Sequence, residues 1–258
     1  MLYHCLLTLH DNVFFATREM GILYETGKFL HNWALSYAFF SGRQLSQPYR
    51  LSGDRAQRPS YFEAGAENSL LVLNNLGIYV FPAQPLEWSY QINTFKAAQT
   101  AYYGRSKQFG EKGAERNYPI NYGRAKELAV GSRYRTYLLA PEAVTIPRWI
   151  RLGKWAAKVR VEVLPIPERC LMVRSGAYAC LHPLNPLDLP PEMEVRLYDR
   201  AVMPPSSLFS RAHLVGEHWA IAGEEWQAYR REYPHLPREV YLPRSCTYGA
   251  SYPAASAS

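Results

Sequence analysis

Long hydrophobic runs and paired cysteines are both missing from this sequence. No apolar run reaches the ~20 residues that a membrane-spanning helix needs, and the first ten residues lack the basic region of a signal peptide. We therefore expect no membrane segment and a cytoplasmic location. The four cysteines are scattered without a C-x-x-C pair, which favours buried thiols over disulfides or zinc ligands. Neither a metal nor an organic cofactor is predicted.

Catalytic motifs are equally scarce. The chain has no G-x-G-x-x-G after a strand, no Walker loop, no G-x-S-x-G and no H-E-x-x-H. His213 and His218 are five residues apart, which suits neither one face of a helix nor one face of a strand. His31 and Tyr24 could supply the acid and base of a ribonuclease, but their spacing does not require it. We predict that the protein is not an enzyme.

What the sequence does contain is a concentration of positive charge. The whole chain carries a net charge of +7. Residues 93–164 hold 14 lysines or arginines and 5 acidic residues, a net charge of +9, which leaves −2 for the remainder of the chain. Charge that is concentrated in one segment of an otherwise nearly neutral protein indicates a polyanionic partner.

The same segment is rich in aromatic residues. Unpaired bases stack on aromatic faces while phosphates need cations, so the combination suits single-stranded RNA. Half-buried strand aromatics beside a solvated cationic face would give the same pattern, and composition alone weighs the two interpretations evenly. The ten aromatic residues are Phe95, Tyr102, Tyr103, Phe109, Tyr118, Tyr122, Tyr134, Tyr137, Trp149 and Trp155.

The first part of the chain predicts a strand followed by a helix. Residues 1–10 alternate in a strand pattern with apolar side chains on both faces. From Phe29 the apolar residues follow a helical period. Thr26 and Gly27 stand where the N-cap belongs, and Gly42 stands at the expected end.

Three polar residues, Lys28, His31 and Asn32, would share an exposed face at the start of this helix. The free N–H groups of a helix start favour an anion, so phosphate binding at this face is one interpretation. A merely solvated face is the other interpretation, and it is at least as well supported by the pattern.

The rest of the chain predicts mostly strands. Residues 69–82 indicate one or two buried strands, residues 159–163 a strand with one wet face, and residues 208–221 a strand pair. Glycine and charge over residues 104–123 favour a loop or hairpin tip. Prolines interrupt regular structure after residue 183. An opening strand, one early helix and then many strands predict an α+β fold of the ferredoxin-like kind.

The segment from Arg148 to Trp155 carries the most suggestive local pattern. Arg148, Arg151 and Lys154 recur every three residues around Gly153, and two tryptophans flank them. Glycine allows the backbone to turn tightly or to approach a ligand closely. A backbone clamp on RNA is the favoured interpretation. The alternative is a bulged strand whose tryptophans belong to the core and whose cations are solvated.

Several distinctive segments occur in order between residue 2 and about residue 206, and none is a generic catalytic pattern. They are LYHCLLTLHDN at 2–12, FFATRE at 14–19, LYET at 23–26, LHN at 30–32, YGRAKEL at 122–128, the segment at 148–155 and PLNPLDL at 183–189. Together they resemble the type I-D member of the CRISPR "Cas five" family, within the repeat-associated RAMP superfamily.

This resemblance implies a function. Members of the family are non-catalytic subunits of an RNA-guided surveillance complex of antiviral defence. They bind the 5′ handle of the guide RNA (crRNA), cap the backbone filament and contact the large subunit. The resemblance also implies a position near the protospacer-adjacent (PAM-proximal) target DNA, where base pairing supplies the sequence specificity. Two alternatives stay open: a metal-independent endoribonuclease that processes precursor guide RNA, and an adaptor whose basic segment docks on an acidic subunit.

The resemblance further implies a ferredoxin-like, RRM-like RAMP domain with an inserted β-hairpin thumb. We assign this RNA-binding domain to residues 1–165, with the candidate thumb at about 93–120. Residues 166–249 would form a β-rich, proline-containing extension that packs on it. Residues 250–258 are small and polar and would form a disordered tail.

The predicted RNA-binding residues combine the resemblance with the charge pattern. Cations would neutralise the phosphates of the handle, and aromatic rings would stack on its splayed bases. The candidates are Lys28, His31, Lys96, Tyr102, Tyr103, Arg105, Lys107, Arg124, Lys126, Arg148, Arg151, Lys154 and Trp155. One departure from the superfamily is the lack of a clear multi-glycine loop.

Overall fold

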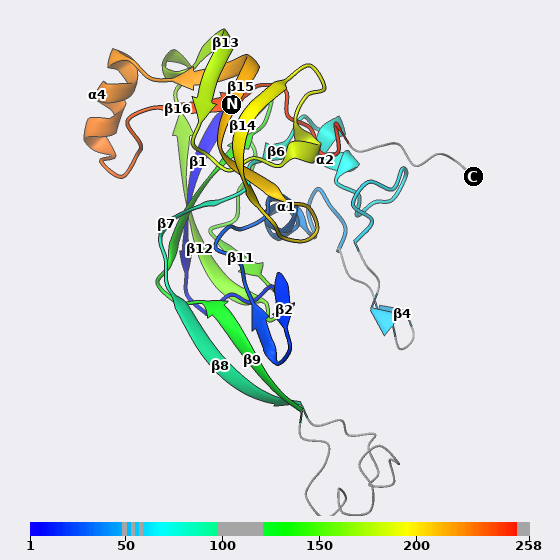
Figure 1. The fold of residues 1–258 in the computed structure, drawn as a ribbon. Helices are drawn as coiled ribbons and strands as arrows, with labels where there is room; N and C mark the ends of the chain where they lie inside the picture. The colour runs from blue at the N-terminus through cyan, green and yellow to red at the C-terminus, as the bar shows by residue number, and fades with distance from the viewer. Residues whose placement is uncertain (48–50, 53–54, 57–58, 98–120, 252–258) are drawn as a thin grey trace, which may run out of the picture.

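A six-stranded antiparallel sheet forms the centre of the molecule (Figure 1). The structure, a computed structural model, describes residues 1–47, 51–52, 55–56, 59–97 and 121–251. Across the sheet the strands are β11 (Trp149–Leu152), β12 (Ala157–Ile166), β1 (Leu2–Leu9), β10 (Arg133–Leu139) and β6 (Tyr79–Val80), with β7 (Gln84–Glu87) also paired to β10.

The positions of β1 and β12 follow from their side-chain patterns. β1 lies between β12 and β10 and is buried on both faces, which explains why its sequence is apolar on both sides. In β12, Val159 and Val161 are buried while Lys158, Arg160 and Glu162 are exposed. The predictions of an opening strand and of a later strand with one wet face are therefore confirmed.

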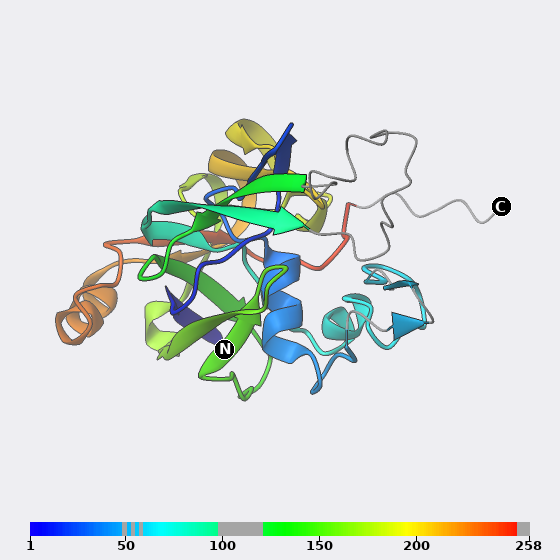
Figure 2. The same ribbon diagram turned by 90° about the horizontal axis from the view of Figure 1, so that it is seen from below.

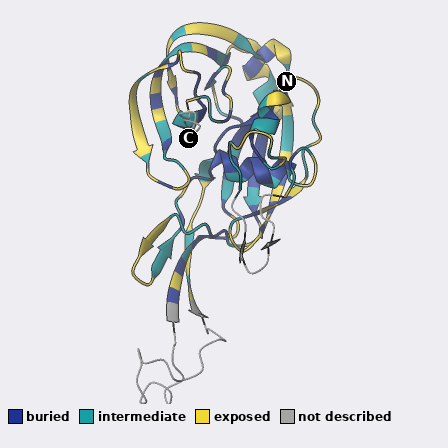
Figure 3. Cartoon of the chain, turned by 90° about the vertical axis from the view of Figure 1, so that its right-hand side faces the viewer, coloured by how far each residue is buried: buried dark blue, intermediate teal, exposed yellow. Residues whose placement is uncertain are grey.

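α1 (Asn32–Phe40) lies against β6 and β11 and is the most uniformly buried helix of the described residues (Figures 2 and 3). Its start differs from the prediction. His31, rather than Thr26, is the N-cap residue. The Thr26 hydroxyl instead accepts a hydrogen bond from the N–H of Phe15 at 3.0 Å, so it stabilises the loop that leads into the helix.

The strand prediction over residues 69–82 is wrong for its first half. Leu71–Asn75 forms the short helix α2, and the strand β6 begins only at Tyr79. The hydroxyl of Ser69 accepts the N–H of Leu71 at 3.3 Å, which favours a helical turn over an extended chain. Gly77 then takes a positive φ of +64°, which ends the helix and turns the chain into β6.

A second sheet and a peripheral helix follow the central sheet in sequence. Leu208–Ile221 is one continuous strand, β15, rather than the predicted strand pair. Three strands pair with β15: β13 (Met172–Cys180), β14 (Glu194–Ala201) and β16 (Val240–Pro243). The same part of the chain contains the 3-10 helices η1 (Glu168–Cys170) and η2 (Pro186–Asp188) and the helix α4 (Glu224–Glu232). The predicted domain boundary at residue 165 falls at the end of β12, yet one hydrophobic core extends from Leu2 to Tyr248 and includes both sheets.

A third sheet projects from the molecule as an arm (Figure 1). Its strands are β2 (Arg18–Met20), β3 (Leu23–Glu25), β9 (Asn121–Leu128) and β8 (Tyr90–Ala97), in that order, and β8 and β9 form its long antiparallel pair. A separate small pair consists of β4 (Leu51–Ser52) and β5 (Arg55–Ala56). Most of the predicted tail, residues 250–258, lies outside the described residues.

The fold is mostly β with few helices, which agrees with the predicted α+β class at this coarse level. Four cysteines, Cys5, Cys170, Cys180 and Cys246, are buried and unpaired, as predicted. Within the described ranges, no helix combines the length and the apolar character needed to cross a bilayer.

A buried carboxylate joins α1 to the segment before β14. Asp188 is fully buried, and its oxygens accept hydrogen bonds from Asn32 Nδ2 at 2.7 Å, Trp33 Nε1 at 3.2 Å and Tyr79 Oη at 3.2 Å. The N–H of Gly249 donates to its other oxygen at 2.8 Å. Buried carboxylates are tolerated only when their oxygens are hydrogen-bonded, and this one is satisfied by four separate donors.

Replacing Asp188 by alanine should therefore destabilise the protein strongly. The change removes the acceptor of four donors, three of them buried, and a buried donor that is left unsatisfied costs about 1–3 kcal/mol. We expect the free energy of unfolding at pH 7, measured by urea denaturation, to fall by about 3 kcal/mol or more. The matched control is Asp199→Ala, which removes an exposed carboxylate paired with Arg211 and should cost less than about 1 kcal/mol. Equal losses for the two variants would contradict this account.

The same carboxyl group gives the stability a defined pH dependence. Burial raises the pKa of Asp188 to about 6, so the folded state holds its proton more tightly than the unfolded state. Its contribution to the free energy of unfolding is full below about pH 4 and is lost as the pH rises through 6. The stability of the wild type relative to Asp188→Asn should fall by up to about 3 kcal/mol between pH 4 and pH 7. Parallel pH profiles of the two proteins would show this assignment to be wrong.

Candidate nucleic-acid interface

The turn between β11 and β12 is built around a glycine that the structure requires. Gly153 has a φ of +76°, and a Cβ atom there would lie 2.6 Å from the carbonyl oxygen of Phe14. The N–H of Lys154 donates to that same oxygen at 2.7 Å. The chain turns tightly at Gly153, which is one of the two roles expected of it, and the group that approaches the glycine is the protein's own backbone. The turn is thus fixed against the segment after β1, and its neighbours are held in place.

Two tryptophans beside this turn are exposed and also packed on protein rings. Trp155 is 51% exposed and stacks on Phe14, with ring centroids 4.4 Å apart. Trp149 is 44% exposed, lies edge-on to His10, and has the ammonium group of Lys158 4.1 Å from its ring centroid. The interpretation that these tryptophans belong to the core is therefore wrong, and each ring still presents surface to solvent.

The cations of the turn differ in their partners. Arg148 and Lys154 are exposed and have no ion-pair partner among the described residues. Arg151 is exposed too, but its guanidinium lies 4.0 Å from the carboxylate of Asp11 and donates to the carbonyl of Ala156 at 3.2 Å. Arg148 and Lys154 therefore keep their full charge for an external anion, whereas that of Arg151 is partly compensated.

A groove of about 980 Å³, which we call the helix groove, runs between α1 and this turn. Small side chains of α1, Ala34 and Ala38, line it on one side. Trp149, Arg151 and Lys154 line it on the other, and residues 203–205 and Arg43 complete it. Sequence reasoning missed Arg43, because only the packing of α1 against β11 brings it to the same hollow. The groove therefore combines cations, an exposed tryptophan and apolar surface.

His31 does not occupy the exposed face that the sequence predicts. It is 3% exposed, and Asn32 is fully buried. Its Nδ1 accepts the N–H of Trp33 at 3.2 Å, and its Nε2 lies 3.0 Å from the hydroxyl of Ser206. Burial lowers the pKa of His31 to about 3, so the ring is neutral at physiological pH. The prediction of an exposed His31 is wrong because this residue caps the helix. Its side chain folds back onto the helix start and accepts an N–H that was expected to face an anion.

The two candidate cations of the arm lie on β9, apart from the helix groove. Arg124 is exposed and has no ion-pair partner among the described residues. Lys126 is paired with Glu25 at 3.0 Å, and its ammonium group also lies 4.4 Å from the ring centroid of Tyr90. Lys126 is thus largely committed to contacts within the protein, while Arg124 is available. Lys28 does not line the helix groove; together with Phe29 it lines a second hollow.

Several candidate residues fall outside what the structure describes. Tyr102, Tyr103, Arg105 and Lys107 lie outside the described residues, as does most of the candidate thumb at 93–120. The backbone of Lys96 belongs to β8, but its side chain is outside the description. These assignments stay predictions.

Two of the ten aromatics are core residues rather than stacking surfaces. Tyr134 and Tyr137 on β10 are 0% and 1% exposed. Burial raises the pKa of both phenols above the ordinary range. For these two residues the alternative interpretation, strand aromatics buried in a sheet, is correct.

The family of the chain follows from a comparison of its sequence with protein-family models. The model described as "Type I-D CRISPR-associated protein Cas5/Csc1" matches residues 1–251. The molecule is therefore a CRISPR-associated protein. It belongs to the type I-D Cas5/Csc1 family.

Solved structures of CRISPR proteins show a distant likeness. A chain in the cryo-EM structure of the Type III-B Cmr-beta bound to cognate target RNA and AMPPnP superposes with a TM-score of 0.43 at 8% identity, covering 91% of this chain and 90% of that one. A crystal structure of a CRISPR protein from Archaeoglobus fulgidus gives a TM-score of 0.35 at 9% identity, covering 94% and 100%. Comparison with curated proteins gives no match.

A Gly153→Ala variant tests whether the turn is fixed as described. The left-handed φ costs an L-residue about 1–2 kcal/mol, and the overlap with the Phe14 carbonyl adds a backbone shift of similar cost. We expect the free energy of unfolding to fall by about 3 kcal/mol in a denaturant titration. Gly131→Ala is the matched control, since Gly131 has a φ of +84° with no atom near its Cβ position, and it should lose only the conformational part. If both variants lose the same amount, Phe14 does not restrict the turn.

Proposed function

We propose that this protein is a non-catalytic subunit of a type I-D CRISPR RNA-guided effector complex and that it binds the 5′ handle of the guide RNA in the helix groove. Membership of the Cas5/Csc1 family supports the assignment to the effector. The observation that carries the site is the arrangement around Gly153. There Lys154 and the half-exposed Trp149 line the groove, and the exposed cation Arg148 lies just before β11.

The physical argument for a single strand rests on the mixed lining of the groove. Phosphates need cations with uncompensated charge, and Lys154 and Arg43 line the groove without an ion-pair partner among the described residues. Bases need flat apolar surface, which Trp149 and the alanine side of α1 supply. A double helix would present only its phosphates to such a surface. A single strand can use both kinds of lining.

The finer architecture extends this proposal. The central sheet with α1 would be the ferredoxin-like RAMP domain, and the β8–β9 arm would be the root of the β-hairpin thumb. In the assembled effector the protein would cap the backbone filament, contact the large subunit and lie near the protospacer-adjacent target DNA. Arg124, exposed on the arm, is the cation best placed to reach such a neighbour.

The state of two buried histidines, His4 and His31, supports the non-catalytic assignment. His31 uses both ring nitrogens inside the protein, and burial lowers its pKa to about 3. His4 is also buried, with a pKa lowered to about 3 by burial and by the charge of Arg135. A general acid works best when its pKa lies near the working pH, so neither ring is tuned for RNA cleavage at neutral pH. Clean cleavage of repeat RNA by the purified protein in EDTA would contradict this part of the proposal.

The double variant Arg43→Gln/Lys154→Gln tests the groove directly, because both side chains line it. Loss of two phosphate contacts should weaken binding of single-stranded handle RNA by roughly 10- to 30-fold at 0.1 M salt. It should also reduce the slope of log affinity against log salt by about 1.4. Both quantities are measured by fluorescence anisotropy between 50 and 200 mM salt.

The matched control removes the same number of charges elsewhere. Arg174→Gln/Arg231→Gln replaces two exposed arginines on β13 and α4, away from the groove. This control should keep nearly the wild-type affinity and slope. An equal loss in both double variants would show that net charge, rather than the groove, determines binding.

A further inference from the structure

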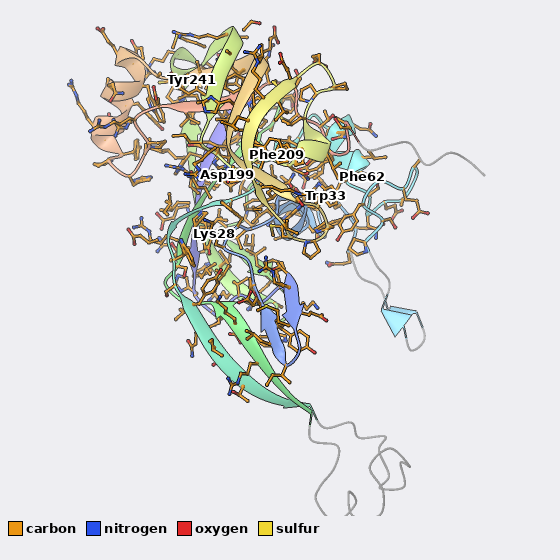
Figure 4. The ribbon with its side chains drawn as sticks, viewed as in Figure 1. Lys28, Trp33, Phe62, Asp199, Phe209 and Tyr241 are labelled. Atoms are coloured by element: carbon orange, nitrogen blue, oxygen red, sulfur yellow. The ribbon has the colours of Figure 1, made fainter. Side chains whose placement is uncertain are left out.

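A second hollow is separate from the helix groove, and the proposed handle site does not use it. This hollow, the arm-root cleft, has a volume of about 600 Å³. It lies where β7 leads into the arm and faces the β14–β15 pair of the second sheet. Figure 4 shows two of its lining residues, Lys28 and Asp199, on this side of the molecule. The residues used below are Lys28, Trp88, Asp199, Arg200 and Arg211.

A small hydrophobic cluster contacts both hollows. Phe29, Met203 and Leu208 are buried together, with Ala201 packed against them. Lys28, which lines the cleft, and His31, which lines the groove, are only three residues apart, which limits their Cα separation to about 11 Å. A strand lying in the helix groove would therefore pass close to the arm-root cleft.

Charge makes this cleft a site for an anion. Three of its lining residues, Lys28, Arg200 and Arg211, are cationic, and the one carboxylate, Asp199, forms an ion pair with Arg211. The Nε of Arg200 donates to the Ser207 hydroxyl at 3.1 Å, which orients the guanidinium and leaves its other N–H groups available. Lys28 and Arg200 thus keep uncompensated charge within the described residues.

A further cation, Arg135, contacts a lining residue of the cleft without lining it itself. Gln84, which lines the cleft, accepts a hydrogen bond from Arg135 Nη2 at 2.8 Å. The Nε of Arg135 is buried and has no partner within the described part of the chain. No acidic side chain is paired with this arginine in the described ranges, so its charge adds to the positive potential of the cleft.

An exposed tryptophan, Trp88, adds an aromatic surface to the cations of the cleft. Trp88 is 42% exposed at the mouth of the cleft. Among the described residues its ring contact is edge-type, with Tyr90 at a centroid distance of 5.0 Å. A large aromatic ring exposed beside unpaired cations is the combination that binds a base together with its phosphate.

The backbone is strained where the cleft's arginines lie. Arg211 has a φ of +51° inside the long strand β15, and β14 has a register irregularity just before Asp199. Such conformations are costly for residues with a side chain and cluster at ligand sites, and bulges redirect side chains. This strain accompanies the charge and the tryptophan and does not carry the inference by itself.

We propose that the arm-root cleft binds one nucleotide of a single strand, with the base stacked on Trp88 and the phosphate held by Lys28 and Arg200. The recognised chemistry is a phosphodiester and one unpaired base, which RNA and DNA share. The cleft is separate from the helix groove, so its occupancy can be tested independently of handle binding.

Tryptophan fluorescence of the full chain tests the stacking. Ten-nucleotide single-stranded RNA and DNA are titrated separately into the wild type, Trp88→Phe and Trp88→Ala. We expect quenching in the wild type that is reduced in Trp88→Phe at nearly unchanged affinity, because phenylalanine still stacks. Trp88→Ala should lose roughly tenfold in affinity. The nucleic acid that produces these effects, RNA or DNA, is identified as the ligand of the cleft. Wild-type affinity for Trp88→Ala with both strands overturns the proposal.

Charge variants separate this cleft from the helix groove. Lys28→Gln and Arg200→Gln should each reduce the salt slope of binding by about 0.7, whereas Arg231→Gln on α4 should leave it unchanged. Lys154→Gln, in the groove, should weaken binding. The difference in quenching at saturation between proteins with Trp88 and with Phe at position 88 should stay the same in this background. If Lys154→Gln acts and the cleft variants do not, the cleft proposal fails while the proposed function stands. If only the cleft variants act, the groove assignment fails instead.

Discussion

The structure depends on the burial of one carboxylate at the junction of its two main sheets. Asp188 accepts hydrogen bonds from the start of α1, from β6 and from the segment after β16. The network continues from Asn32 to Asn185, from Asn185 to the Ser206 hydroxyl, and from there to His31. Because His31 caps α1, this polar chain fixes the helix that forms one wall of the groove. The carboxyl group is accommodated at this depth only while these elements supply its hydrogen bonds, so its burial requires all of them to be in place.

The same constraint explains which parts of the site the sequence could predict. The glycine turn with its cations and tryptophans is local, so residues 148–155 could be singled out from the sequence, whereas the RNA clamp assigned to them stays a prediction. His31 was misassigned because its burial depends on Ser206, which is 175 residues away in the sequence. Arg43 was missed for the same reason, since only the packing of α1 against β11 brings it to the groove. Residues whose role is set by distant partners carry no local signal.

The elements of the fold also divide into those that residue patterns predicted and those that they did not. Strands with a clear period, β1 and β12, were predicted from residue patterns. The apolar run at 69–82 was not, because a short buried helix and a buried strand have the same composition. The uninterrupted length of β15 was also hidden, since Gly216 resembles a turn residue yet lies within the strand with a φ of +156°. A regular alternation therefore identified a strand whether it was buried or half exposed, whereas an apolar run without a period did not distinguish a helix from a strand.

Two separate hollows are each lined by cations and an exposed tryptophan, and the Phe29 cluster contacts both. The central claim is that the guide RNA follows the helix groove. Ultraviolet crosslinking of the assembled effector to its guide RNA, with crosslinked peptides identified by mass spectrometry, tests it most directly. The account predicts crosslinks in peptides containing Arg43 and residues 148–155. Crosslinks confined to α4 and the exposed side of β13 would contradict it.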